Sequence, residues 1–321
     1  MTQKEHILAT FHFDEDILAI MEKEFIVHRL WEAQDKTAFM QGLAGTVRAV
    51  FTSATIKIDP AFMDALPKLE IICGFGAGYE RIDLAAASAR RIKVTNVEAT
   101  NSGCVADFAM GLLISTARGM MPAVRFVRTG KWPARFGGAD PQLYPISPRF
   151  YGRKLGILGM GQIGLAVARR AVAFDMDVGY HNRKPRADVN HSYFGSPLEL
   201  AEWCDYLVIA APGGEGTKHL VNGTVLDALG PRGVVVNVGR GSIIDQQALI
   251  DRLSDGRLYA AGLDVIDGEP AVPEKLLELE NAVITPHCAG VTRESSEASM
   301  DTVLRNIRAQ FAGQPLLTQV N

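Results

Sequence analysis

Three polar side chains that could perform acid–base and carbonyl chemistry follow successive apolar segments late in the chain. Arg240 lies in the motif NVGRG, Glu269 in the turn DGEP, and His287 closes the motif TPH. A guanidinium can grip a carboxylate through two hydrogen bonds and polarise a carbonyl. A histidine can exchange a proton near neutral pH, and a neighbouring carboxylate orients its imidazole and favours the protonated form. Singly, each is more often a solvated or structural residue, so their joint placement predicts the catalytic set.

A glycine-rich turn earlier in the chain predicts a dinucleotide site. An apolar segment at residues 155–158 leads into Gly159, Gly161 and Gly164, spaced G-x-G-x-x-G, and a helical pattern follows. Such glycines permit a tight turn, a close approach of pyrophosphate to the backbone and close packing of the helix on the strand. A glycine triplet alone usually marks an ordinary turn. The strand before it, the helix after it and a second strand at residues 176–180 favour the nucleotide site.

The turn after that second strand indicates which nucleotide is bound. A site for NAD ends this strand in Asp or Glu, which accepts hydrogen bonds from the adenosine ribose hydroxyls. This chain has Tyr180, His181, Asn182, Arg183 and Lys184 there, without a carboxylate. Arg183 can bind a 2′-phosphate with a planar fork of donors, Asn182 can donate an amide N–H, and Lys184 adds charge. A solvated basic loop is the alternative, but we expect NADPH to be favoured over NADH.

These motifs resemble those of the D-isomer-specific 2-hydroxyacid dehydrogenases. The resemblance runs nearly end to end, and its most specific signatures are NVGRG at residues 237–241, GLDVIDGEP at residues 262–270 and TPH at residues 285–287. Within the family the chain is most similar to the NADP-preferring glyoxylate/hydroxypyruvate reductase branch. YHNR at residues 180–183 is similar to that branch's aromatic-x-Ser/Asn-Arg pattern, and RTGKW at residues 128–132 also fits.

The resemblance implies a role for each candidate residue. Arg240 would bind the substrate carboxylate and carbonyl, His287 would be the acid/base, and Glu269 would pair with His287. The substrate carboxylate would also meet the backbone of Gly76, Ala77 and Gly78. Asp264 would lie near the nicotinamide carboxamide. The cofactor-binding residues would be Gly159, Gly161, Gln162, Ile163, Gly164, His181, Asn182, Arg183, Pro212, Thr217, Val238 and Asp264.

The expected reaction is the NADPH-dependent reduction of a small 2-oxo acid, of the glyoxylate or hydroxypyruvate type, to a D-2-hydroxy acid. NAD remains possible as a cofactor, and an NAD-linked D-lactate or D-3-phosphoglycerate-type dehydrogenase is one alternative. The missing acid after Tyr180 counts against it. A nucleotide-sensing scaffold, similar to the family's transcriptional corepressors, is an alternative of another class. Retention of Arg240, Glu269 and His287 together counts against a scaffold.

The pattern of apolar segments predicts two α/β units with parallel sheets. We expect strands at residues 6–11, 25–29, 49–52, 71–73, 93–95, 155–158, 176–180, 205–210, 233–238, 258–263 and 282–284. We expect helices at residues 16–24, 62–66, 84–89, 101–118, 165–174, 197–204, 244–253 and 293–311, the last packing back on the N-terminal domain. The resemblance implies two Rossmann-like domains that flank a cleft: a flavodoxin-like substrate-binding domain of residues 1–99 and 288–321, and an NADP-binding Rossmann domain of residues 100–287.

Residues 120–151 are the least regular part of the chain. Prolines alternate there with Trp132, Phe136 and other aromatic residues. This composition predicts an ordered arm that packs on a partner subunit, or a surface loop that covers the Rossmann unit. The family resemblance likewise implies a homodimer.

Composition bounds the remaining function classes. A chain of 321 residues is too long for one ordinary core, and a net charge of −3 gives no electrostatic footprint for nucleic acid or an anionic membrane. No apolar run reaches the ~18 residues that span a bilayer, and the N-terminal segment has acids where a signal peptide is apolar. Cys73, Cys104, Cys204 and Cys288 share no metal-ligand spacing. We expect a cytoplasmic protein with reduced core thiols and no metal.

Overall fold

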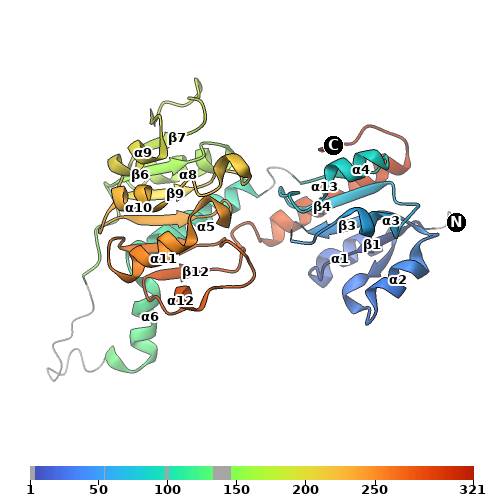
Figure 1. The fold of residues 1–321 in the computed structure, drawn as a ribbon, viewed down its shortest axis with the longest axis horizontal. Coiled ribbons are helices and arrows are strands. Elements are labelled where there is room, and N and C mark those ends of the chain that lie inside the picture. Colours follow the sequence, from blue (N-terminus) through green and yellow to red (C-terminus); the bar gives the residue numbers. More distant parts are fainter. Residues whose placement is uncertain (1–3, 54, 98–100, 133–145) are drawn as a thin grey trace. The chain divides into compact units, whose positions relative to one another are not determined.

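The chain folds into two α/β units (Figure 1). The computed structural model describes residues 4–53, 55–97, 101–132 and 146–321. One unit comprises Met1–Asn101 and Val291–Asn321, and the other comprises Ser102–Gly290. Both crossovers between the units fall a few residues further along the chain than the boundaries expected from the sequence.

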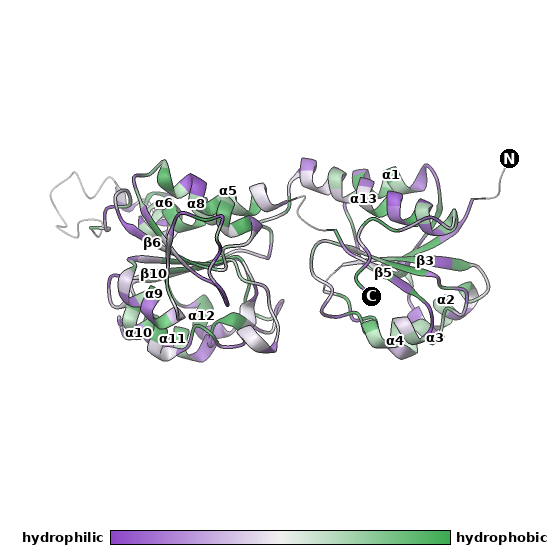
Figure 2. Ribbon diagram, turned by 90° about the horizontal axis from the view of Figure 1, so that it is seen from above, coloured by the Kyte–Doolittle hydropathy of each residue, from purple (hydrophilic) through white to green (hydrophobic). Residues whose placement is uncertain are grey.

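The first unit is a five-stranded parallel sheet with strand order β2-β1-β3-β4-β5. Its strands are β1 (His6–Ala9), β2 (Ile26–Arg29), β3 (Val47–Ser53), β4 (Ile71–Phe75) and β5 (Lys93–Thr95). Its helices are α1 (Glu15–Glu22), α2 (Lys36–Leu43), α3 (Pro60–Asp64), α4 (Leu84–Ala89) and α13 (Arg293–Phe311). Helices α1 and α13 cover one face of the sheet, and α2, α3 and α4 cover the other (Figure 2). Each of α1 to α4 begins after an aspartate whose carboxylate accepts a backbone N–H of the first turn.

Helix α13 packs on the N-terminal sheet, which confirms the expectation for the last helix. Val303 and Ile307 are buried in one cluster with Phe51 of β3. The helix begins with a capping box, in which the Ser295 N–H donates to Thr292 Oγ1 and the Thr292 N–H donates to Ser295 Oγ, both at 3.1 Å. The C-terminal helix therefore contributes to the same hydrophobic core as the N-terminal strands.

The second unit is a seven-stranded parallel sheet with strand order β12-β11-β10-β9-β6-β7-β8. Its strands are β6 (Lys154–Leu158), β7 (Asp177–His181), β8 (Ser192–Tyr193), β9 (Tyr206–Ile209), β10 (Val234–Asn237), β11 (Ala260–Leu263) and β12 (Ala282–Ile284). Its helices are α5 (Ser102–Ala117), α6 (Met120–Arg128), α8 (Gln162–Val172), α9 (Pro197–Trp203), α10 (Gly223–Leu229), α11 (Gln246–Ser254) and α12 (Glu274–Leu277). Strand order reverses between β6 and β9, and such a switch point is where open α/β sheets bind nucleotides.

Helices cover both faces of this second sheet. Helices α5 and α8 lie on one face, and α9, α10 and α11 lie on the other (Figure 2). In β10, Val234 and Val236 belong to the core on the α5 side, whereas Val235 belongs to the core on the α9 side. A strand buried on both faces reads as a continuous apolar run, which is why the sequence indicated these strands well.

The structure extends the predicted elements and corrects one of them. Every expected strand overlaps an observed strand, but β8 and the helices α2, α10 and α12 were not expected. The expectation of irregular structure from residue 120 is wrong for Met120–Arg128, which forms α6. Pro122 is compatible with a helix because it lies in the first turn, where its missing N–H has no intrahelical partner. Of the expected arm, residues 133–145 lie outside the described residues.

Helix α5, expected as a helix at residues 101–118, is a largely buried core helix. In the described part of the chain, no single helix has the length and hydropathy of a membrane span. Only α5 and α6 together meet those measures, and the pair is bent by 63°.

All four cysteines are free thiols, but they are not all core residues. Cys73 and Cys204 are buried, and burial raises the pKa of each thiol to about 12. Cys104 and Cys288 are only partly buried, so the expectation of core thiols is wrong for these two.

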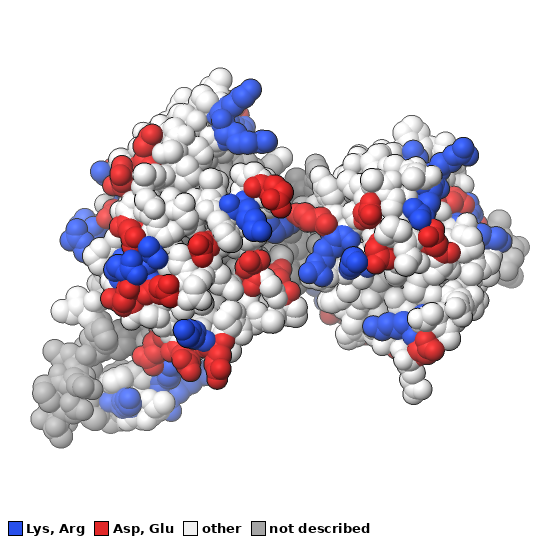
Figure 3. All heavy atoms as spheres, in the orientation of Figure 1, with Lys and Arg blue, Asp and Glu red and all other residues white. Residues whose placement is uncertain are grey.

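Acidic and basic side chains are interspersed over the face of the second unit drawn in Figure 3. Several form ion pairs on its surface, such as Arg252 with Asp227 and Arg257 with Asp255, each at 2.7 Å. Exposed pairs of this kind contribute little to stability. The candidate site must therefore be identified from individual side chains rather than from a charged surface.

Candidate active site

The three glycines of the turn after β6 meet three different constraints. Gly159 has a φ of 102°, and a Cβ there would lie 2.6 Å from the backbone nitrogen of Ala211. A Cβ on Gly164 would overlap the Gly159 carbonyl oxygen, so the third glycine lets α8 approach the strand. A Cβ on Gly161 would meet nothing within 4 Å. Gly161 is also the N-cap of α8 and makes no side-chain cap hydrogen bond.

The open space at Gly161 fits a pyrophosphate. The helix N-terminus carries a partial positive charge and N–H groups that point along its axis. Gln162 and Ile163 begin α8, so their N–H groups face the space above Gly161. Of the cofactor-binding residues expected from the sequence, Gly159, Gly161, Gln162, Ile163 and Gly164 thus lie together in one turn whose geometry suits a phosphate.

The ribose turn after β7 is tied to this glycine turn. Asn182 Oδ1 accepts the Met160 N–H at 2.7 Å, which turns the Asn182 amide nitrogen away from the glycine turn. Arg183 is exposed, and within the described part of the chain it forms no ion pair. His181 is engaged elsewhere, since its Nδ1 lies 2.8 Å from the Phe194 carbonyl oxygen and its ring stacks on Tyr193. Asn182 and Arg183 therefore supply the donors on this turn.

Arg186 is a contact of the glycine turn that the sequence did not reveal. Its Nη1 donates to the Met160 carbonyl oxygen at 2.9 Å, while its other nitrogens pair with Asp188. Its backbone N–H donates to the Tyr180 hydroxyl at 2.9 Å. The peptide groups of Met160 are thus held on both sides, by Asn182 and by Arg186. A second arginine close to Arg183 was the available sequence signal, but its contact depends on the direction of one carbonyl.

Arg240 is placed by a rigid turn after β10. Asn237 is fully buried, and its side chain donates to the Arg240 carbonyl oxygen at 2.9 Å and accepts the Gly239 N–H at 3.0 Å. The Arg240 stem packs against Gly213, where a Cβ would lie 2.9 Å from Arg240 Cγ. A Cβ on Gly241 would overlap the backbone of Ile266. Arg240 is therefore fixed by the NVGRG turn and by close contacts at Gly213 and Gly241, where a side chain would clash.

His287 and Glu269 form the pair that the sequence predicted. His287 Nδ1 lies 2.7 Å from Glu269 Oε1. His287 has a left-handed backbone with φ of 53°, and its N–H is bonded to the carbonyl oxygens of Asp264 and Thr285. Strained backbone of this kind persists only where the surrounding contacts hold it, and it clusters at functional sites. The turn that carries Glu269 is held by Gln246 of α11, whose Oε1 accepts the Asp267 N–H at 3.1 Å.

Glu269 stays ionised across the neutral range. Burial raises the pKa of its carboxyl, but the hydrogen bond from His287 and the charges of His287 and Arg240 outweigh burial and hold the pKa below 4.5. The charge of Arg240 therefore reaches Glu269, which places all three predicted catalytic side chains in one electrostatic environment.

Asp264 joins the two loops that carry Glu269 and His287. It is buried, and its carboxylate accepts the Thr285 hydroxyl at 2.6 Å and the N–H groups of Cys288 and Ala289 at 2.9 Å. These donors flank His287 in the chain. The expected contact of Asp264 with the nicotinamide carboxamide is thus accompanied by a structural role, which is to position the histidine.

The remaining predicted residues lie at the same edge of the sheet. Pro212 and Thr217 follow β9, and the Thr217 hydroxyl donates to the Pro212 carbonyl oxygen at 2.9 Å. Val238 follows β10 and is buried, with its N–H bonded to the Ile209 carbonyl oxygen. Since the carboxyl ends of parallel strands share one edge, these residues, the glycine turn and the catalytic set line that edge together. Gly76, Ala77 and Gly78 follow β4 in the first unit.

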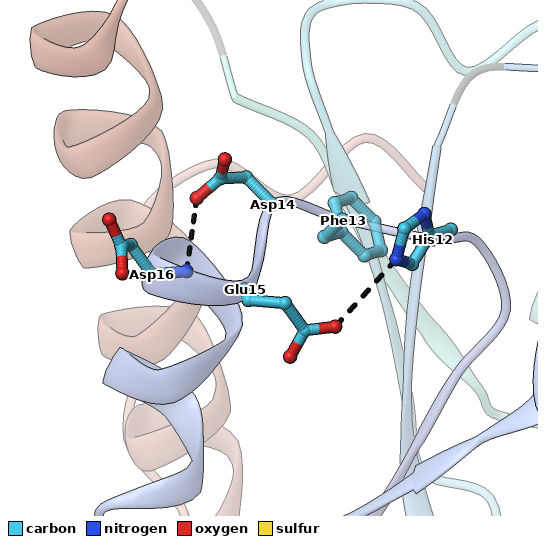
Figure 4. A pocket seen from close by; sticks show the side chains of 5 residues that line it. All are labelled: His12, Phe13, Asp14, Glu15 and Asp16. Carbon is cyan, nitrogen blue, oxygen red and sulfur yellow. Dashed lines mark hydrogen bonds and ion pairs between the residues drawn. The ribbon is translucent and has the colours of Figure 1, made fainter.

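A hollow at the start of α1 in the first unit is lined by His12, Phe13, Asp14, Glu15 and Asp16 (Figure 4). Three of its polar side chains have partners within the fold. Asp14 accepts the Asp16 N–H at 3.0 Å as the cap of α1, and Glu15 pairs with Arg29 at 2.9 Å and with His12 at 3.7 Å. These contacts account for the cluster as a helix start, and it contains none of the predicted site residues.

A nucleotide-binding unit with an arginine and a carboxylate-paired histidine at its strand ends defines a nicotinamide-dependent oxidoreductase. Residues 110–289 match the family model described as the NAD binding domain of D-isomer specific 2-hydroxyacid dehydrogenase. The chain belongs to the D-isomer-specific 2-hydroxyacid dehydrogenase family, which confirms the resemblance and the expected fold class.

Relatives and solved structures resemble the chain over nearly its full length. A hydroxyphenylpyruvate reductase from Plectranthus scutellarioides is 40% identical over 300 residues, covering 94% of each chain. A glyoxylate/hydroxypyruvate reductase A from Arabidopsis thaliana is 39% identical, also with 94% of each chain covered. The crystal structure of an NADPH-dependent glyoxylate/hydroxypyruvate reductase from Sinorhizobium meliloti, in complex with NADP and malonate, is 36% identical with a TM-score of 0.86. That match covers 99% of this chain and 97% of the other.

Proposed function

We propose that the protein reduces a small 2-oxo acid to the D-2-hydroxy acid with NADPH. The observation that carries this proposal is the 2.7 Å contact between His287 Nδ1 and Glu269 Oε1 on the strand-end edge that also carries Arg240. The relatives named above, a hydroxyphenylpyruvate reductase and glyoxylate/hydroxypyruvate reductases, bear the names of 2-oxo acids. Glyoxylate and hydroxypyruvate are therefore the first substrates to examine.

The side chains divide the work of the reaction. A bound NADPH supplies the hydride that adds to the carbonyl carbon of the substrate. Arg240 binds the substrate carboxylate and polarises the carbonyl, because a guanidinium offers two parallel donors. His287 donates the proton to the carbonyl oxygen from Nε2, since its Nδ1 faces Glu269. Glu269 orients the imidazole and favours its protonated form.

The choice of NADPH over NADH rests on the ribose turn. Its strand ends without a carboxylate that would repel a 2′-phosphate, and Arg183 is exposed on the turn beside Asn182. The contact between Asn182 Oδ1 and Met160 leaves the amide N–H groups of Asn182 as donors. A phosphate on this turn would accept charge-assisted hydrogen bonds from Arg183, which are stronger than neutral ones.

We also propose that the protein is a homodimer whose interface includes α6. None of the residues of this helix is buried. Met120, Met121, Val124 and Val127 are each 42–49% exposed. A second copy of the chain would cover these apolar side chains, as subunit interfaces bury Met and other apolar residues. Free cysteines rather than disulfides are typical of a reducing compartment, and we place the protein in the cytoplasm.

The proposed function is tested by following NADPH oxidation by the purified protein with a panel of 2-oxo acids. The panel should contain glyoxylate, hydroxypyruvate, pyruvate and hydroxyphenylpyruvate, and the chirality of each product should be determined. We expect turnover with at least one small 2-oxo acid, a D product, and a higher kcat/KM with NADPH than with NADH. Absence of turnover with every member of the panel would overturn the proposal, and equal kcat/KM with both cofactors would overturn the cofactor preference.

A further inference from the structure

The loop after β4 is held from one side by the two residues that follow β5. The Val97 N–H donates to the Gly76 carbonyl oxygen at 2.8 Å, and Asn96 Nδ2 donates to the Ala77 carbonyl oxygen at 3.0 Å. The two successive carbonyls thus face the same side, and Gly76, with a φ of 129°, turns the chain just before them. In a trans peptide the N–H points opposite to the carbonyl. The Ala77 and Gly78 N–H groups therefore both point away from Asn96 and Val97.

These two N–H groups form a donor pair. Among the residues that the structure describes, neither the Ala77 N–H nor the Gly78 N–H has a hydrogen-bond acceptor. Successive backbone N–H groups that converge on one side make a concave site for an anionic oxygen. The loop thus presents the donor geometry that a carboxylate needs without using a charged side chain.

Asn96 is buried, and only one end of its amide has a partner. It is 2% exposed, and its Oδ1 is buried without a hydrogen-bond partner in the described part of the chain. The amide cannot be reversed, because Oδ1 would then face the Ala77 carbonyl oxygen. A buried polar atom without a partner costs stability. In the described part of the chain, the bond to Ala77 is thus the one hydrogen bond that the Asn96 side chain makes.

The backbone of Asn96 is fixed by the end of the chain. The Thr318 hydroxyl donates to the Asn96 carbonyl oxygen at 2.6 Å, and the Asn96 N–H donates to the Thr318 carbonyl oxygen at 3.3 Å. The C-terminal segment therefore sets the position from which Asn96 reaches Ala77.

We propose that Asn96 is a positioning residue for substrate binding: its amide holds the Ala77–Gly78 peptide so that two backbone N–H groups face the carboxylate of the 2-oxo acid. The inference rests on the proposed function, because it takes the loop of Gly76, Ala77 and Gly78 as the carboxylate subsite. Asn96 itself does not touch substrate. Neither its residue type nor its spacing in the sequence pointed to this role.

The test compares Asn96→Asp and Asn96→Ala with the unmodified full-length protein. Asn96→Asp keeps the shape but replaces the N–H donor with an acceptor, and Asn96→Ala removes the side chain. For each protein we would measure KM and kcat with glyoxylate, the Kd of oxalate for the NADPH-bound enzyme, the Kd of NADPH, and Tm. We expect the glyoxylate KM and the oxalate Kd to rise by about tenfold or more, a smaller change in kcat, and an unchanged NADPH Kd.

Thr318→Val is the matched control. It removes the part-buried hydrogen bond from its hydroxyl to the Asn96 carbonyl oxygen, but it keeps the backbone bond between the two residues and the amide that holds Ala77. We therefore expect a lower Tm without a tenfold rise in KM or in the oxalate Kd. If both variants of Asn96 are poorly folded, Asn96→Ser keeps a hydroxyl donor at this position. We expect it to give a rise in the oxalate Kd that is clear but smaller than the other two.

The outcomes separate this inference from the proposed function. Folded variants of Asn96 with unchanged KM and oxalate Kd would overturn the inference while leaving the reductase activity in place. A rise equal to that of Thr318→Val would also overturn it, because a general loss of stability would then explain the effect. An unmodified protein that neither reduces a 2-oxo acid nor binds oxalate would instead overturn the proposed function.

Discussion

Replacing Glu269 with Gln should move the alkaline limb of the reduction rate to lower pH. Nδ1 of His287 lies 2.7 Å from Glu269 Oε1, and the two side chains are 41% and 32% exposed. At that distance the interaction of two unit charges is about 1.5 kcal/mol with the screening of bulk water, and measured interactions of exposed charge pairs reach about 1 kcal/mol. An energy of that size corresponds to about one pH unit. Reduction requires the protonated imidazole. Loss of the carboxylate should therefore shift the decline of the reduction rate to a pH about one unit lower.

The acid side of the profile follows from the ionisation of Glu269. Burial raises the pKa of this carboxyl, but the hydrogen bond and charge of His287, with the charge of Arg240, lower it below its ordinary value of 4.5. The contribution of the pair is therefore present above pH 4.5 and is lost only as the pH falls through the lower folded-state value. Glu269 is therefore ionised throughout the neutral and alkaline range in which the limb is measured.

The assay is kcat/KM for glyoxylate at saturating NADPH, measured as a function of pH for the unmodified protein and for Glu269→Gln. Asp267→Asn is the matched control, since it removes a carboxylate from the same turn without touching His287. We expect its limb to coincide with that of the unmodified protein. An unshifted limb in Glu269→Gln would refute the reasoning, because Glu269 would then have no influence on the proton donor.

Three further predictions concern the cofactor, the substrate and the subunit interface. Arg183→Ala should raise the Kd of NADPH, measured by fluorescence titration, by about tenfold to a hundredfold and leave the Kd of NADH unchanged. An equal loss of affinity for both cofactors would contradict a 2′-phosphate contact. Gly213→Ala should raise the substrate KM by about tenfold, because the new Cβ would lie 2.9 Å from Arg240 Cγ and displace the guanidinium. An unchanged KM would show that the arginine accommodates the methyl group. Val124→Lys should dissociate the dimer in sedimentation experiments, whereas a monomeric unmodified protein would rule out the α6 interface.

Much of the fold could be predicted because the strands are short apolar runs between turns. β10, with three valines buried between two helical layers, shows why: a strand buried on both faces leaves a strong pattern. Short helices leave a weaker apolar pattern in the sequence. Helix α2 buries only Met40 and shows no clear apolar stripe, and α10 has only seven residues, the first of which is a glycine. Asp35 and Asn222 cap these two helices and were the signals that could have indicated them.

The candidate site could be predicted in part for a different reason. Its catalytic side chains follow strands, and parallel strands bring their carboxyl ends to one edge, so Arg240, Glu269 and His287 could be grouped from the sequence. Supporting contacts could not be foreseen, because they depend on the directions of individual carbonyls and amides. The hydrogen bonds from Asn96 to the Ala77 carbonyl and from Arg186 to the Met160 carbonyl are contacts of this kind.

The most direct test of the account is the turnover number of His287→Gln. Glutamine preserves polarity and approximate size but cannot donate a proton as an acid. The account predicts that kcat for the reduction of glyoxylate by NADPH falls by about a hundredfold or more, while the Kd of NADPH stays within about twofold of that of the unmodified protein. Near-normal kcat in a folded His287→Gln protein would contradict the assignment of His287 as the proton donor.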